Sequence, residues 1–145
     1  MEIRQRIIDC FEGEYRFLSN FYNTNVEYEG LIYKNSEAAF QAAKCMYAND
    51  RERFTEYNPG KAKREGRKVL LRLDWEEVKD QVMLDIVRAK FSQNEILKEK
   101  LLATGDAHLV EGNTWGDCYW GVCEGKGRNH LGIILMQVRK ELQNV

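Results

Sequence analysis

The amino-acid sequence predicts a single α+β domain over residues 1–145, in which several helices surround a small β-sheet. Two observations predict this class: short strand-like segments with turn residues come first, and longer segments with apolar residues at helical spacing follow. No linker, repeat or low-complexity tract divides the chain. A chain of 145 residues also buries roughly 68–70% of the surface that it exposes when unfolded, which is enough for one core.

Four short segments are predicted to be strands. Tyr15–Leu18 alternates loosely and runs into a turn. Val26–Tyr28 and Leu31–Tyr33 flank Glu29-Gly30, and this arrangement predicts a β-hairpin. His108–Glu111 is expected to be a further short strand that leads into an irregular loop.

The first helix is predicted over Glu37–Met46, because this segment consists mainly of good helix formers and follows the N-capping pair Asn35-Ser36. Glu37, Gln41 and Lys44 fall at i, i+4 and i+7, so they share one face of this helix. That face either meets solvent as a charged stripe or looks into a cavity. The almost wholly apolar character of the other faces favours the cavity.

Four more helical segments are expected after the first helix. One begins near Pro59 and is strongly basic over Lys61–Arg72, one runs from Asp74 to about Ser92, one follows Asn94 and stops near Gly105, and the last starts at about Asn129. The apolar stripes of the two longest helices are predicted to face the core: Trp75, Val78, Val82, Ile86 and Ala89 in one, and Leu131, Ile134, Leu135, Val138 and Leu142 in the other.

Composition limits the classes of function. A net charge of -1 argues against bulk electrostatic binding to nucleic acid or membrane, and the absence of a long apolar run or signal region predicts a cytoplasmic protein. The four irregularly spaced cysteines suit reduced thiols. Zinc binding by Cys118 and Cys123 with His108 and His130 is a minor alternative, because the ligand spacing of zinc sites is missing, so no metal or other cofactor is expected.

The segment Glu111–Gly132 combines carboxylates, amides, indoles and glycines without helical or strand periodicity. It is interpreted either as an active-site loop or as a packed aromatic turn. In the second interpretation Trp115, Tyr119 and Trp120 cover the core and Asp117 caps a turn.

Several separated motifs support a relationship that composition and periodicity do not supply. They are Phe17–Tyr22, Tyr33 with Ser36–Lys44, Lys90–Asn94, Leu101–Asp106, Leu109–Glu111, Asp117, Trp120-Gly121, Asn129–Gly132, Leu135-Met136 and Arg139. With these motifs in this order, the chain resembles the YbiA-like family, also called NADAR, over roughly residues 15 to 140. Cys123 departs from the family pattern, which often has a glycine there.

The resemblance implies a YbiA-like fold and an N-glycosidase that cleaves a bond between a ribose carbon and a nitrogen. The implied substrates are phosphoribosylamino-pyrimidine intermediates of riboflavin synthesis or guanine that carries ADP-ribose, the latter free or in nucleic acid; no membrane partner is implied. The alternatives are a module that binds ADP-ribose or a nucleotide without cleaving it, which needs no carboxylate or lysine, and a structural interaction protein.

The residue types fit such a reaction. Loss of an amine from ribose builds positive charge, which a carboxylate stabilises while an acid assists the leaving nitrogen, and Glu37 and Asp117 are the available pair. Lys44 is the candidate for a Schiff base with the opened sugar.

The remaining candidates bind the substrate. Trp115 and Trp120 are expected to stack on the base or ribose, while Gln41 and Asn129 hydrogen-bond it; the family motifs add Asn20 and Gly121. A basic run either receives a phosphate or is a solvated face: Lys61, Lys63, Arg64 and Arg67. We expect one shared pocket for Glu37, Gln41, Lys44, Asp117, Trp120 and Asn129.

Overall fold

A computed structural model describes residues 6–145, which form two compact units. The terminal unit joins the chain up to Ser19 to Glu95–Val145, and the central unit is Asn20–Asn94.

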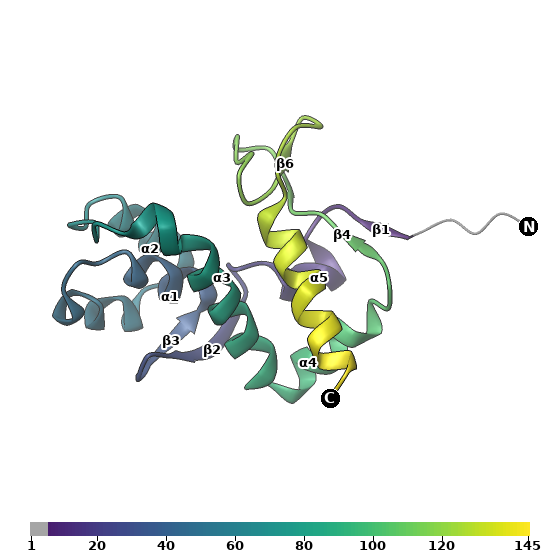
Figure 1. The fold of residues 1–145 in the computed structure, drawn as a ribbon, viewed down its shortest axis with the longest axis horizontal. Helices are drawn as coiled ribbons and strands as arrows, with labels where there is room; N and C mark the ends of the chain where they lie inside the picture. Colours follow the sequence, from purple (N-terminus) through teal and green to yellow (C-terminus); the bar gives the residue numbers. More distant parts are fainter. Residues whose placement is uncertain (1–5) are drawn as a thin grey trace, which may run out of the picture. The chain divides into compact units, whose positions relative to one another are not determined.

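The central unit begins with the predicted hairpin. Strands β2 (Asn23–Tyr28) and β3 (Leu31–Asn35) pair in antiparallel fashion, and Figure 1 shows them beside each other. Glu29 and Gly30 connect them with φ values of 50° and 85°, the left-handed conformation that a tight two-residue hairpin turn requires. The hairpin prediction is therefore confirmed.

Helix α1 (Ser36–Ala43) follows the hairpin directly, and all eight of its residues are buried. Asn35 is its N-cap, since the Asn35 side chain accepts a hydrogen bond from the backbone N–H of Ala38 at 2.7 Å. The predicted end at Met46 is wrong. The backbone N–H of Met46 instead donates to the carbonyl of Leu70, which takes the chain out of the helix.

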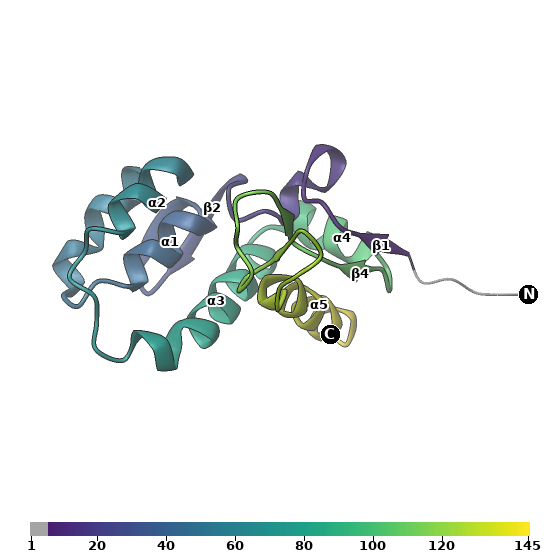
Figure 2. The same ribbon diagram turned by 90° about the horizontal axis from the view of Figure 1, so that it is seen from above.

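Helix α2 (Pro59–Gly66) begins at Pro59 as predicted, with Asn58 as its N-cap. Its basic sequence continues beyond Gly66, but the helix ends there. The labels in Figures 1 and 2 show α1 and α2 lying side by side within the central unit, and they pack closely. Two short 3-10 turns precede α2, at Ala48–Asp50 and Glu52–Glu56.

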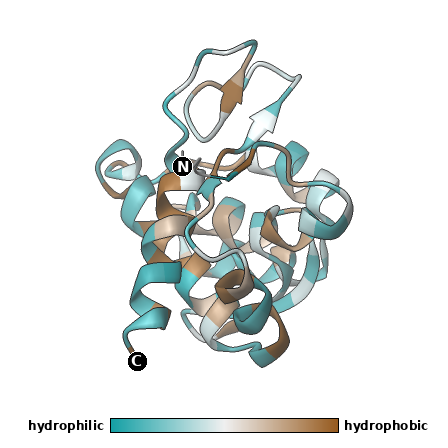
Figure 3. Ribbon diagram, turned by 90° about the vertical axis from the view of Figure 1, so that its right-hand side faces the viewer, coloured by the Kyte–Doolittle hydropathy of each residue, from teal (hydrophilic) through white to brown (hydrophobic). Residues whose placement is uncertain are grey.

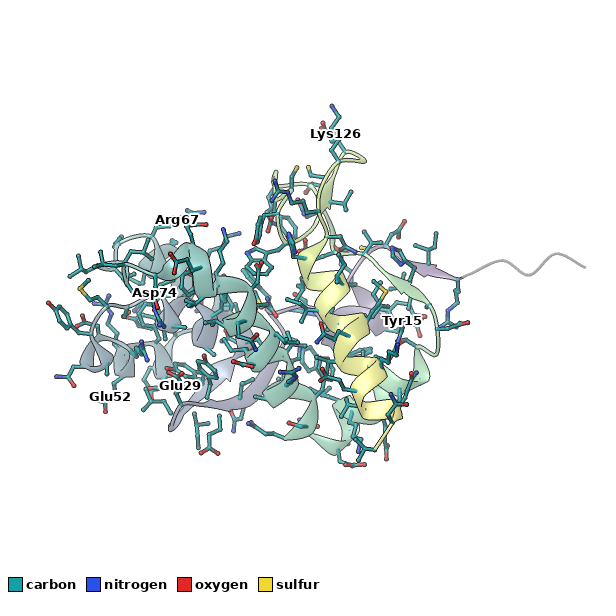
Figure 4. All side chains as sticks on the ribbon, viewed as in Figure 1. Tyr15, Glu29, Glu52, Arg67, Asp74 and Lys126 are labelled. Carbon is teal, nitrogen blue, oxygen red and sulfur yellow. The ribbon has the colours of Figure 1, made fainter. Side chains whose placement is uncertain are left out.

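Helix α3 (Trp75–Ser92) matches the predicted span. Asp74 occupies the N-cap position, but its carboxylate makes no hydrogen bond to the helix and instead accepts from the Arg72 guanidinium at 2.6 and 3.1 Å. Figure 4 labels Asp74 at this point of the chain. The predicted core stripe holds for most members: Trp75, Val82 and Ile86 are buried, whereas Val78 and Ala89 are half-buried.

The terminal unit contains two short parallel ladders. Strand β1 (Ile7–Ile8) pairs with β4 (His108–Leu109), and β5 (Gly112–Asn113) pairs with β6 (Val122–Cys123). The His108–Glu111 prediction is thus correct for its first two residues.

The predicted strand at Tyr15–Leu18 is wrong. Gly13–Leu18 forms a 3-10 helix, η1, in which local bonds such as Tyr15 N–H to the Glu12 carbonyl satisfy the backbone. Phe17 and Leu18 are consecutive and both buried, which an alternating half-buried strand does not allow.

Two helices complete the terminal unit. Helix α4 (Glu95–Ala103) stops before Gly105, which has the predicted left-handed conformation at φ 64°. Helix α5 (His130–Gln143) has alternating hydrophobic and hydrophilic segments (Figure 3). Its predicted core stripe is buried except for Leu142, which is half-buried.

The α+β class is therefore confirmed. Strand residues in the described part of the chain are distributed over three two-stranded sheets. Among residues 6–145 no helix is both long enough and apolar enough to cross a membrane. The assignment of residues 1–145 to one domain stays a prediction.

Candidate functional site

Helix α1 presents a buried polar pair. The Gln41 Nε2 group donates a hydrogen bond to Glu37 Oε1 at 2.8 Å, and the two side chains are only 5% and 8% exposed. This bond shows that the i, i+4 residues share one face, as the helical register predicts. Because a buried carboxylate is costly unless it is hydrogen-bonded, the Gln41 donor stabilises the charged form of Glu37.

Lys44 lies at the C-cap of α1 and continues this polar face. Its Nζ atom is 6.0 Å from the ring centres of both Phe40 and Trp75. The apolar rings exclude water from the Lys44 amine. Their π faces also attract its charged ammonium form. The Lys44 amine is thus partly desolvated but still interacts with its surroundings.

Charges around Lys44 act in both directions on its pKa. Burial is the largest influence and lowers the pKa from the ordinary value of 10.5; Glu37 raises it, and Arg67, Lys63 and Lys79 lower it. The electrostatic interaction with Glu37 agrees with the shared face. A lysine with a lowered pKa has more of the neutral, nucleophilic amine near neutral pH.

The four basic candidates of α2 divide into two groups. Lys63 and Arg67 are one helical turn apart and both act electrostatically on Lys44. Lys61 and Arg64 are not among the charges that shift the pKa of Lys44. Exposure does not separate the two groups, because Arg64 and Arg67 are both exposed. The structure thus associates only half of the predicted phosphate-binding run with Lys44; Figure 4 labels Arg67 at the end of α2.

Asn20 lies next to the start of α1. Its backbone carbonyl accepts a hydrogen bond from the Glu37 N–H at 3.1 Å, and its side-chain amide donates to Met83 Sδ at 3.5 Å. The motif residue Asn20 therefore holds the first turn of α1 and the carboxylate-bearing residue with it.

The loop of the terminal unit uses Asp117 to hold its own backbone. Asp117 Oδ1 accepts hydrogen bonds from the N–H groups of Tyr119 at 3.0 Å and Trp120 at 2.9 Å. Asn113 accepts from the Asp117 N–H and donates to its carbonyl. These contacts agree with the alternative interpretation in which Asp117 caps a turn.

The aromatic residues of this loop differ in exposure. Trp115 is 61% exposed, so it does not cover the core, whereas Trp120 is half-buried. Tyr119 packs against Trp120 edge to face at 4.8 Å and lies tilted against His130 at 4.4 Å. Arg128 lies over the Tyr119 ring at 5.9 Å. Sequence analysis did not select Tyr119, His130 or Arg128 as site residues.

Both polar atoms of the Asn129 side-chain amide hydrogen-bond to the backbone. Its Nδ2 donates to the Leu109 carbonyl at 2.9 Å, and its Oδ1 accepts from the Glu111 N–H at 2.9 Å. Its backbone is left-handed, with φ 53°, a conformation that asparagine tolerates better than most residues. Asn129 therefore fixes the start of α5 against the strand that leads into the loop.

Gly121 is required by close packing against Glu111. A Cβ atom at position 121 would lie 1.7 Å from Glu111 Oε2 and 2.1 Å from the Glu111 carbonyl oxygen. Glu111 is half-buried and accepts a hydrogen bond from Asn113 Nδ2 at 3.1 Å. Sequence analysis missed this carboxylate, although it belongs to the Leu109–Glu111 motif and precedes the loop directly.

Lys90 is a second buried lysine that sequence analysis did not select as a site residue. It is 1% exposed, and burial lowers its pKa to about 7. Its Nζ atom lies over the rings of Tyr22 at 5.8 Å and Phe91 at 5.1 Å. Helical spacing could have predicted its burial, because Lys90 falls four residues after Ile86 on the apolar stripe of α3.

Metal ligands do not cluster in the part of the chain that the structure describes: residues 6–145 contain no group of three or more His, Cys, Asp or Glu side chains that could hold an ion. The four cysteines are free thiols, of which Cys10 and Cys118 are exposed.

The predicted site residues fall into two sets. The central unit brings together Glu37, Gln41 and Lys44, with Asn20, Lys63 and Arg67 acting on them. The terminal unit holds Asp117, Trp120, Gly121 and Asn129. The expected pocket that combines both sets stays a prediction.

Comparison with known proteins gives consistent results. The sequence profile of the NADAR domain matches residues 10–143. N-glycosidase YbiA of Escherichia coli K12 is 42% identical over 133 residues, which are 89% of this chain and 82% of that protein. A riboflavin biosynthesis protein of Vibrio vulnificus is 40% identical over 88% of this chain, but the match covers only 35% of that longer protein.

A solved structure gives the same result for the fold. The NMR structure of E. coli YbiA superimposes with a TM-score of 0.84 at 40% identity, covering 98% of this chain and 88% of that one. The buried polar face of α1 and the loop before α5 therefore lie in a known fold. From the profile match and these identities, the chain belongs to the NADAR family.

Proposed function

We propose that this protein is an N-glycosidase, which hydrolyses a bond between a ribose carbon and a nitrogen. One observation supports this most strongly: α1 carries a buried, hydrogen-bonded Glu37 together with a partly desolvated Lys44. Relatives from E. coli and Nostoc punctiforme are named N-glycosidases, the second 47% identical over 52% of this chain. A module that only binds nucleotides has no need of this pair.

Glu37 is the proposed charge-stabilising group. As the carbon–nitrogen bond of the ribose breaks, positive charge develops on the sugar carbon, and a fixed carboxylate interacts with that charge more strongly than with the neutral substrate. Gln41 holds the carboxylate by its 2.8 Å bond. Glu37 is therefore expected to contribute more to the rate of the reaction than to substrate affinity.

Lys44 is the proposed nucleophile where the leaving group is an exocyclic amine. Such a glycosylamine opens to an imine between the sugar carbon and the nitrogen. The neutral Lys44 amine adds to that carbon, the original nitrogen leaves as the protonated amine, and water then hydrolyses the lysine imine to release the sugar. The lowered pKa of Lys44 supports this role, because only the neutral amine can add.

Lys63 and Arg67 are the proposed phosphate-binding residues, since both act on Lys44. Lys61 and Arg64 of the same run are the weaker candidates, because they are not among the charges that shift the pKa of Lys44. A phosphate next to the ribose occurs both in phosphoribosylamino-pyrimidines and in ADP-ribosylated guanine. The name of the V. vulnificus relative, a riboflavin biosynthesis protein, favours the first class.

The loop residues have proposed supporting roles. Trp115 and Trp120 supply flat faces for a base or ribose, and Gly121 and Asn129 hold the loop that carries Trp120. A chemical role for Asp117 rests on its Oδ2 atom, because Oδ1 caps the turn. Glu111 is an alternative carboxylate in this unit. The exposed thiols of Cys10 and Cys118 suit a reducing, cytoplasmic compartment.

The test is an assay of the purified protein with both substrate classes, with the released base or amine and the sugar product identified by mass spectrometry. We expect release of the nitrogenous group from at least one class. Tight binding without release would favour the alternative module that recognises ADP-ribose or a nucleotide but does not cleave it.

Lys44→Met separates the two chemical routes. If a Schiff base forms, the variant loses nearly all activity, and borohydride traps the sugar on the Lys44 peptide of the wild type. Lys34→Met is the matched control, because Lys34 is an exposed residue of the same unit that pairs with Glu56. Measurable turnover by Lys44→Met, without a trapped adduct in the wild type, would establish direct displacement by water instead.

A further inference from the structure

Helix α2 lies very close to the Gln41 side chain of α1 at Gly66. A Cβ atom built at this position would lie 1.9 Å from Gln41 Oε1, 2.6 Å from Gln41 Cδ and 3.0 Å from Gln41 Cβ. The first two separations are shorter than real Cβ contacts allow, and the third is tighter than most of them. Gly66 has no left-handed backbone that would demand a glycine, and alanine is the better helix former. The reason for glycine at position 66 is therefore contact with Gln41.

The contact affects how the Gln41 carboxamide is oriented. Its Nε2 group donates to Glu37, while its Oε1 atom is buried and accepts no hydrogen bond from any group in the described part of the chain. The amide oxygen would repel the Glu37 carboxylate if it were turned toward it. The oxygen consequently points at Gly66, where the absence of a side chain leaves room for it.

We propose that Gly66 is a positioning residue, which holds the Gln41 carboxamide in the orientation that donates to Glu37. The expected effect of Gly66 on turnover rests on the proposed N-glycosidase function, whereas its effect on the orientation of Gln41 does not. A side chain at position 66 displaces Gln41, because Gln41 is the flexible partner in the contact. Glu37 then loses the hydrogen bond from Gln41, which helps to fix the direction of its carboxylate. Gly66 itself touches no substrate in this scheme.

Helix α2 offers a matched control in Gly60. A Cβ atom at position 60 would meet only ordinary contacts, 3.5 Å from the Arg64 guanidinium and 3.6 Å from Asn58 Oδ1. Gly60→Ala and Gly66→Ala make the same chemical change in the same helix. They differ in whether the new methyl group reaches Gln41.

The expected results differ accordingly. Gly66→Ala should lower kcat by roughly 10–100-fold with little change in KM, because a small displacement of a catalytic group costs rate more than ground-state binding. Gly60→Ala should keep the wild-type kcat. A wild-type kcat in Gly66→Ala would overturn the proposal.

A double variant tests whether Gly66 acts through Gln41. In Gln41→Ala the two closest colliding atoms, Oε1 and Cδ, are absent and only the Cβ contact at 3.0 Å remains, so adding Gly66→Ala should cost little further activity and should not prevent folding. If Gly66→Ala alone fails to fold while the double variant folds, the contact is confirmed by that rescue. If the double variant loses as much again as Gly66→Ala loses alone, or remains unfolded, Gly66 has another role and the proposal is wrong.

An NMR measurement makes the test independent of catalysis. The side-chain amide protons of Gln41 should exchange faster with solvent and shift in Gly66→Ala, because their bond to Glu37 is broken, and should stay unchanged in Gly60→Ala. Were the wild type to lack N-glycosidase activity, this difference would still support the positioning role while contradicting the proposed function. Unchanged Gln41 amide signals in Gly66→Ala would refute the positioning role whatever the activity.

Discussion

Helix α1 and the loop Glu111–Arg128 both hold polar residues of the candidate site, but they use them differently. In α1 the backbone bonds mainly within the helix, apart from the first N–H groups, which bond to Asn20 and Asn35, and the side chains of Glu37 and Gln41 bond to each other. In the loop, the side chains of Asn113 and Asp117 bond mainly to backbone groups. Lys126, which is exposed at the tip of this loop, is labelled in Figure 4.

The difference follows from the rule that backbone N–H and C=O groups need partners. A helix supplies them internally, so its buried polar side chains remain for chemistry. An irregular loop lacks a regular ladder and recruits Asp and Asn side chains in its place. We therefore expect substitutions in α1 to change the reaction and substitutions in the loop to change stability first.

The largest effect is expected from Glu37→Gln. The amide keeps the shape of the side chain but removes its charge, so turnover should fall by roughly 10²–10⁴-fold with a smaller change in KM. Steady-state kinetics on the substrate that the wild type cleaves measure both quantities.

Glu77→Gln is the matched control for this variant. Glu37 and Glu77 both lie in the first turn of a helix, where a carboxylate stabilises the helix by about 0.3–1 kcal/mol. Both variants should lose this helix-dipole contribution, but Glu77→Gln should keep full turnover. If Glu37→Gln folds normally and turns over at the wild-type rate, Asp117 becomes the principal carboxylate to test.

Lys90 extends the comparison to another helix, since this buried side chain of α3 has a pKa of about 7 against an ordinary 10.5. Between these values the unfolded chain binds more protons than the folded one. The free energy of unfolding should therefore rise with pH from about 7 toward 10.5, by up to about 1.4 kcal/mol per pH unit. Lys90→Met should remove this rise in urea titrations across that range, whereas Lys34→Met should keep it. Parallel pH curves for wild type and Lys90→Met would refute the expectation.

Asn129→Ala tests the structural use of the loop. The variant loses two hydrogen bonds and places alanine in a left-handed backbone, so it should lower the free energy of unfolding by about 2–4 kcal/mol. Asn129→Gly loses the same bonds without the backbone strain and should be about 1 kcal/mol more stable than Asn129→Ala. Equal stability of the wild type and both variants in chemical denaturation would contradict the assigned role.

The smallest effect is expected from Asp117→Asn. Asparagine keeps an oxygen that can accept from the N–H groups of Tyr119 and Trp120, so the turn and most of the activity should persist. Asp117→Ala removes the acceptor and should cost about 1–2 kcal/mol of stability. A loss of turnover in Asp117→Asn as large as that of Glu37→Gln would break the comparison and assign chemistry to the loop.

Local signals in the sequence predicted much of the central unit. The Glu29-Gly30 turn, the caps at Asn35 and Asn58 and the shared face of Glu37 and Gln41 all depend on residues within four positions of one another. Such bonds form wherever the local sequence allows them, so a single sequence is enough to predict them.

Other features depend on partners that are distant in the sequence. Helix α1 ends early because the backbone of Met46 bonds to Leu70, and the left-handed Asn129 is held by Leu109 and Glu111. Lys90 could be placed on an apolar stripe from its register, but only packing determines how far its amine is desolvated.

By itself, the sequence determined the hairpin, the helix starts, the order of the family motifs and the register that joins Glu37 to Gln41. The tertiary structure alone decided that Gly66 faces Gln41 and that the Asn129 side chain bonds to the backbone of Leu109 and Glu111. The physical reason is that helix caps and tight turns are satisfied by neighbours in the chain. The surroundings of a buried polar group depend instead on which distant segments pack against it.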